Sequence, residues 1–96
     1  MNDDYLNIPV KCKINVNNLT IIVYDTMSLS NIYCYDNNGL QLWRVGDYHE
    51  KELLFLYACY SKPRKCVVAF DAHGRRFDVN LKDGSLNNMN YDSSLK

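Results

Sequence analysis

Apolar and polar side chains alternate along much of this 96-residue chain. Between Val10 and Val16 every second residue is apolar, which is the pattern of a strand with one buried face. Similar short runs follow, and most end at Asn, Asp, Gly or Pro, which favour turns. We predict an all-β fold of seven or eight antiparallel strands in consecutive hairpins, forming a sandwich, a small barrel or a propeller-blade-like meander. The predicted strands cover residues 10–16, 19–24, 31–36, 40–45, 52–60, 65–71 and 75–81, with a short last strand around Leu86.

The first two runs are separated only by Asn17 and Asn18. Asparagine tolerates the positive φ that a two-residue type I′ turn needs, so this pair predicts a tight hairpin. If Val16 lies opposite Leu19, the apolar residues of both strands fall on one face. The expected pairs further along are Ile14 with Ile21 and Cys12 with Val23.

One pattern occurs twice, in YCYDNNGLQLW at 33–43 and VAFDAHGRRFDV at 68–79. Each copy holds an aromatic residue, an Asp, two variable residues and a Gly. Asp36 and Asp71 can accept hydrogen bonds within a type I turn, and Gly39 and Gly74 supply the left-handed residue after it. We predict two equivalent hairpin corners and interpret both carboxylates as turn caps rather than as a catalytic pair.

The segment HEKELLFLYACY is ambiguous, because residues 50–53 favour a helix. The apolar residues that follow do not form a one-sided helical stripe, and a Pro-containing turn comes next. We therefore predict a strand over residues 52–60, with a helix as the alternative.

Composition and charge indicate an ordinary globular domain. The chain is 47% hydrophobic and 23% charged, with net charge +0, so we expect a single domain over residues 1–96 whose polar tail, 87–96, frays. Residues 1–60 hold four Lys/Arg against seven Asp/Glu, and residues 61–96 hold seven against four. This separation predicts a molecule with faces of opposite charge.

Several functional classes are disfavoured by what the sequence lacks. The acidic N-terminus does not resemble a signal peptide, and the longest apolar run, 53–60, is too short to span a membrane, so we expect a cytoplasmic protein without membrane contact. The four cysteines lie in apolar runs without close Cys or His pairs, which predicts reduced thiols, no metal and no cofactor. Only His49 and His73 could act as a catalytic imidazole, and both fall in predicted loops, so we do not expect an enzyme.

Two surfaces remain as candidates for binding. Aromatic and acidic side chains concentrate within ten residues, where aromatic anchors and rim carboxylates would suit a protein partner. This first set is Trp43, Asp47, Tyr48, Glu50 and Glu52. Basic residues gather further along, interleaved with aromatic ones, in a pattern that can hold single-stranded nucleic acid. This second set is Lys62, Arg64, Lys65, Arg75 and Arg76.

The stretches NIYCYDNNGLQLWRV and KCVVAFDAHGRRFDVNLKDGSL, within residues 31–86, resemble small β-rich immunity proteins of bacterial contact-dependent growth inhibition systems. The resemblance implies a cytoplasmic protein that binds a toxin domain, commonly a nuclease, and covers its active site. It assigns no binding residue. Nucleic acid is the less favoured partner because the domain has no net positive charge. A homodimer formed through an exposed strand edge also stays open.

Overall fold

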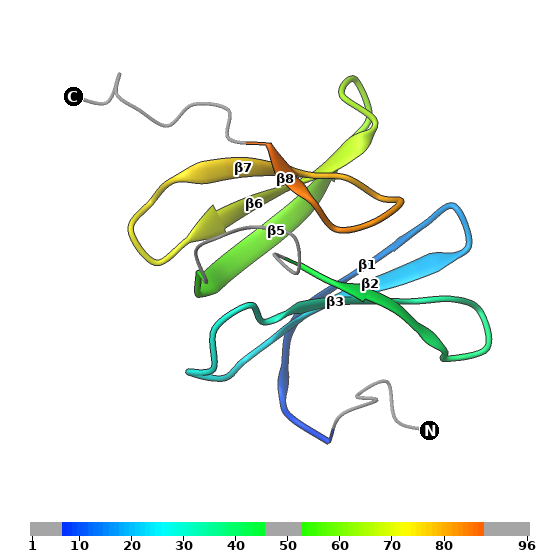
Figure 1. Cartoon of the computed structure of the whole chain (residues 1–96), viewed down its shortest axis with the longest axis horizontal. Helices are drawn as coiled ribbons and strands as arrows, with labels where there is room; N and C mark the ends of the chain where they lie inside the picture. Colours follow the sequence, from blue (N-terminus) through cyan, green and yellow to red (C-terminus); the bar gives the residue numbers. More distant parts are fainter. Residues whose placement is uncertain (1–6, 46–52, 88–96) are drawn as a thin grey trace.

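The computed structural model describes residues 7–45 and 53–87. It is all-β: two four-stranded antiparallel sheets, each a run of consecutive hairpins, in the orders β1-β2-β3-β4 and β5-β6-β7-β8. Figure 1 shows the sheets as two layers, with β5–β8 above β1–β4. The prediction of an all-β fold is confirmed. The strands are β1 (Val10–Val16), β2 (Leu19–Tyr24), β3 (Ile32–Tyr35), β4 (Gln41–Arg44), β5 (Phe55–Ser61), β6 (Cys66–Asp71), β7 (Arg76–Val79) and β8 (Leu86–Asn87).

The described part of the ambiguous segment HEKELLFLYACY, which begins at Leu53, contains strand β5 and no helix. The helix alternative is therefore wrong for this part. This strand begins at Phe55, later than predicted, because Leu53 and Leu54 precede the ladder. Asn87 does not belong to a frayed tail, since it pairs with Asp78 in β8. The rest of the tail lies outside the described residues.

The first hairpin has the predicted turn and register. Asn17 and Asn18 have φ values of 52° and 64°, as a type I′ turn requires. All three expected residue pairs between β1 and β2 are present, from Val16 with Leu19 to Cys12 with Val23. The alternation in the sequence was therefore sufficient to fix which face of this hairpin is buried.

The two Asp-to-Gly corners have the same hydrogen-bond geometry. Asp36 Oδ1 accepts the backbone N–H groups of Asn38 at 2.8 Å and Leu40 at 3.0 Å. Asp71 Oδ1 accepts the corresponding groups of His73 at 3.0 Å and Arg75 at 2.8 Å. In both corners the Gly N–H donates to the Asp carbonyl at 3.0 Å, and the Gly has φ near +80°. The predicted capping role of both carboxylates is confirmed.

The core lies between the sheets. Side chains of both layers form one cluster, including Ile21 and Val23 from the first sheet and Phe55 and Val67 from the second. A buried amide also joins the layers: Asn31 Nδ2 donates to the carbonyls of Tyr24 and Phe55, and Asn31 Oδ1 accepts the Phe55 N–H. Burial without water makes these hydrogen bonds costly to lose. They fix the first residue of β5 against the end of β2.

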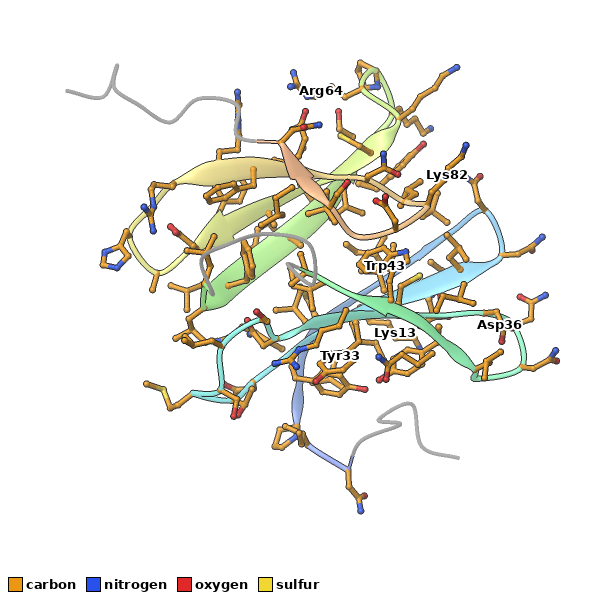
Figure 2. All side chains as sticks on the ribbon, viewed as in Figure 1. Lys13, Tyr33, Asp36, Trp43, Arg64 and Lys82 are labelled. Atoms are coloured by element: carbon orange, nitrogen blue, oxygen red, sulfur yellow. The ribbon has the colours of Figure 1, made fainter. Side chains whose placement is uncertain are left out.

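Trp43 points into the space between the sheets (Figure 2). Its orientation follows from an irregularity in β4, where Gln41 pairs with Tyr35 but Trp43 pairs with Cys34, which leaves Leu42 as an extra residue. Trp43 is 5% exposed, and its indole N–H donates to the Leu81 carbonyl at 2.8 Å. It therefore anchors the β7–β8 loop to the core.

Gly84 is required by this contact. It has φ +76°, and a Cβ atom built there would lie 2.4 Å from Cε3 of Trp43. We expect Gly84→Ala to lower the free energy of unfolding by about 3 kcal/mol, from the left-handed backbone and the overpacked indole together. Gly74→Ala is the matched control, because φ is +80° but nothing lies within 4 Å, and it should cost about 1 kcal/mol. Equal losses in urea unfolding would contradict the close approach of Gly84 to Trp43.

The two corners should differ in energy although they share a geometry. Asp71 is 2% exposed and also accepts from Arg75 Nε at 2.8 Å, whereas Asp36 is less buried. Asp71→Ala leaves two backbone donors and a guanidinium without their acceptor and should cost about 3 kcal/mol, against about 1 kcal/mol for Asp36→Ala. Urea unfolding of both variants measures the difference. Similar losses would mean that the Arg75 pair adds no stability.

Candidate partner-binding face

The outer face of the second sheet carries a row of large side chains. Tyr57, Phe70 and Arg76 are direct neighbours across β5, β6 and β7. The Tyr57 and Phe70 rings lie 6.3 Å apart at 30°. Tyr57 is 52% exposed, and no other aromatic side chain in the described part of the chain is as exposed. The sheet therefore presents the exposed Tyr57 ring beside the half-buried side chains of Phe70 and Arg76.

The row is continued along β7 by Asp78, which faces the same way as Arg76 because it is two residues further on. Arg64 reaches Asp78 from the β5–β6 turn, with Nε and a terminal nitrogen 3.1 Å and 2.6 Å from Oδ2. Asp78 Oδ1 and Arg76 Nε are buried and lack hydrogen-bond partners within the described residues. Unsatisfied buried groups are uncommon in folded proteins. The polar groups of this row are therefore not fully paired by the described residues.

The structure separates the five basic residues that are close in the sequence. Lys62, Arg64 and Lys65 belong to the β5–β6 turn, whereas Arg75 belongs to the β6–β7 corner at the opposite end of β6. The six residues of β6 span roughly 17 Å. Arg75 is ion-paired with the buried Asp71 at 2.8 Å, and Arg64 is paired with Asp78. These residues therefore do not form one continuous basic surface.

A hollow of about 640 Å³ lies beside the β6–β7 corner. Leucines at positions 29, 53 and 54 form part of its wall, together with the corner residues Asp71, His73 and Arg75. His73 is exposed in the turn, and the neighbouring carboxylate of Asp71 is occupied by the corner backbone and Arg75. The polar groups that line this hollow therefore belong to the structure of the corner itself.

The acidic and aromatic set divides into two parts. Asp47, Tyr48, Glu50 and Glu52 lie outside the described residues, so their predicted role stays a prediction. Trp43 is described, and its burial removes it as an exposed anchor, because its ring faces the core and its N–H is bound to Leu81. No pattern in the sequence predicts the extra residue at Leu42 that turns the indole inward.

The cysteines are free thiols. Burial, together with a smaller effect of the negative charge of Asp36, raises the pKa of Cys34 to about 11. Burial also raises the pKa of Cys66, where the Asp78 carboxylate adds to the effect and Arg64 opposes it. Thiols with raised pKa values are weak nucleophiles and poor metal ligands at neutral pH.

Across residues 7–45 and 53–87, no group of three or more His, Cys, Asp or Glu side chains could hold a metal ion. Within the same ranges, no helix has the length and apolar character needed to cross a bilayer.

Comparison with known protein families, curated proteins and solved structures found no match to this chain.

The exposed row could only partly be anticipated from the sequence. Phe70 and Arg76 lie close together in the sequence, but the sequence pattern assigns neither Tyr57 to this row nor the register across β5, β6 and β7. A shift in pairing lets Leu56 stand out between Phe55 and Tyr57, so alternation alone would have placed Tyr57 on the buried side with Phe55. The signal that could have helped is the aromatic pair flanking the second corner.

The raised pKa of Cys34 predicts a loss of stability at alkaline pH. The unfolded chain releases this proton near pH 9, whereas the folded protein holds it up to about pH 11. The contribution of this group to the free energy of unfolding is therefore fully present below pH 9. It falls as pH rises from 9 to 11, and the loss at pH 10 is about 1 kcal/mol. Urea unfolding at pH 7.5 and pH 10 should show a smaller alkaline loss in Cys34→Ala than in the parent protein. An identical loss in both would refute the assignment.

Proposed function

We propose that this chain is a protein-binding module that acts by covering a partner, and that the partner is a toxin domain, as the resemblance to immunity proteins implies. The observation that carries the proposal is the exposed row of Tyr57, Phe70 and Arg76 on the outer face of the second sheet. Tyr and Arg are the residue types that concentrate binding energy in protein interfaces. A sheet holds their backbone in place, which lowers the entropic cost of binding compared with a flexible loop.

The mechanism is occlusion without chemistry. The partner would lie across β5, β6 and β7, cover Tyr57 and Phe70, and supply an acceptor to Arg76. An inhibitory complex of ordinary size buries about 800 Å² on each protein, which a sheet face and its flanking loops can provide. The carboxylates at 47, 50 and 52 stay predicted contacts to cationic groups at the rim of the same partner.

Single-stranded nucleic acid is the alternative, since bases stack on exposed rings next to cations. The placement of the charges favours protein instead. Of the five basic residues, Arg64 and Arg75 are paired with the protein's own carboxylates, and the β5–β6 turn is separated from Arg75 by the length of β6. A track of phosphates needs an unneutralised and continuous line of cations.

Growth rescue tests the proposal. The proposal predicts that a large secreted protein with a variable C-terminal domain is encoded next to this gene. Co-expression of the chain with that C-terminal domain should restore growth. Tyr57→Ala should weaken the complex by about thirtyfold, as loss of an interface anchor typically does, and should reduce protection. Leu40→Ala is the matched control, because Leu40 is 64% exposed but lies at the corner of the other sheet.

Three results bear against the proposal or its details. Absence of rescue by the parent chain would contradict toxin neutralisation. Equal protection by Tyr57→Ala and the parent would contradict the assigned face, and undiminished protection by an Asp47/Glu50/Glu52 triple alanine variant would remove the acidic rim. Salt-sensitive binding to RNA or DNA alone, lost in Arg75→Ala and Arg76→Ala, would establish the nucleic-acid alternative.

A further inference from the structure

We propose that a second hollow, at the end of the second sheet formed by the β5–β6 turn and the β7–β8 loop, binds an acidic segment of the partner protein. This hollow measures about 540 Å³. Figure 2 shows Arg64 and Lys82 at its two contributing loops, Arg64 from the β5–β6 turn and Lys82 from the β7–β8 loop. The inference deepens the proposed function by naming the chemistry of the partner at this end of the face.

The lining of the hollow is basic and rich in amides. Three cationic side chains and one carboxylate give it a net charge of +2, and three Asn side chains add donors and acceptors. Because Arg64 is neutralised by Asp78, the surplus charge belongs to the two lysines. The lining residues are Asn17, Arg64, Lys65, Cys66, Asp78, Asn80, Leu81, Lys82 and Asn87.

The backbone at Lys65 supplies an independent reason to assign a role to this side chain. Lys65 has φ +55°, a left-handed conformation that favours Gly or Asn over Lys. Eight described residues have positive φ, and six of them are Gly or Asn. The two exceptions are Ser30 and Lys65.

Ser30 is explained by the fold, since it is 6% exposed, its N–H donates to Leu53 and its carbonyl accepts from Arg44. Lys65 is exposed, and its ammonium has no hydrogen bond or ion pair to any described residue. The turn does not need a lysine there, because glycine would adopt the same backbone more readily. We infer that the charge, not the backbone, is what this position provides.

The same hollow is continuous with the proposed face, because Arg64 and Asp78 belong to both. It contains no aromatic side chain, and Tyr57 is four residues away along β5 from Ser61 at the turn. A nucleic acid would therefore find cations here without a stacking surface beside them. Carboxylates of a protein segment need only the lysines and the Asn amides.

Peptide binding tests the inference without knowledge of the partner. The ¹⁵N-labelled full chain would be titrated at about 50 mM salt with an eight-residue Glu-Gly peptide, with its Gln-Gly counterpart and with an eight-nucleotide oligothymidine. We expect the Glu-Gly peptide to shift the amides of Lys65 and Lys82. Lys65→Gly and Lys82→Ala should each weaken its binding at least threefold, and Lys65→Gly should not lower the thermal midpoint. Lys62→Ala is the matched control, since Lys62 is exposed in the same turn but does not line the hollow.

Equal binding of the Glu-Gly and Gln-Gly peptides, or equal loss in Lys62→Ala and Lys65→Gly, would overturn the acidic-segment site. Tighter and Lys65-dependent binding of the oligothymidine would also overturn it, in favour of nucleic acid. Growth rescue separates this inference from the proposed function. If the parent and Lys65→Gly/Lys82→Ala protect equally, the hollow has no part in neutralisation, while the proposed function stands.

Discussion

The structure depends on the two carboxylate-capped corners. Each Asp accepts two backbone N–H groups of its own turn, and each following Gly takes the left-handed conformation that closes it. These contacts fix where the chain reverses and so fix the pairing of the flanking strands. Because neighbouring residues of a strand point to opposite faces, a slip of one residue would exchange the core with the surface. The second corner places Phe70 opposite Arg76, and the shift in pairing between Phe55 and Tyr57 brings Tyr57 to the same face.

Polar contacts hold the two sheets together at both ends. Asn31 joins β2 to the start of β5, and Trp43 joins β4 to the β7–β8 loop. The side chains of Asn31 and Trp43 are engaged in these contacts and are therefore not free to bind a partner. The surfaces that we propose for binding lie on the outer face of the second sheet and at its end, where the rings, Arg76 and the two lysines are found.

Local signals predicted much of the fold and little of the site. The Asn17-Asn18 turn, the register of β1 with β2 and both corners depend on residues within a few positions of one another, so pattern and turn chemistry were enough. The inward position of Trp43 depends on one extra residue in β4, and the role of Asn31 depends on a strand 24 residues away. The basic hollow combines residues of the β5–β6 turn and the β7–β8 loop, which are far apart in the sequence. No sequence motif therefore predicts it. Ion pairing likewise divides basic residues that the sequence groups together.

The register of the second sheet is the most direct test of this account. Nuclear Overhauser spectra of the free protein should show contacts between the rings of Tyr57 and Phe70 and between the side chains of Phe70 and Arg76, as their pairing requires. A register shifted by one residue would instead bring the Phe70 ring against Phe55 and Phe77 in the core. Contacts of that second kind would contradict the exposed row and the binding surface derived from it.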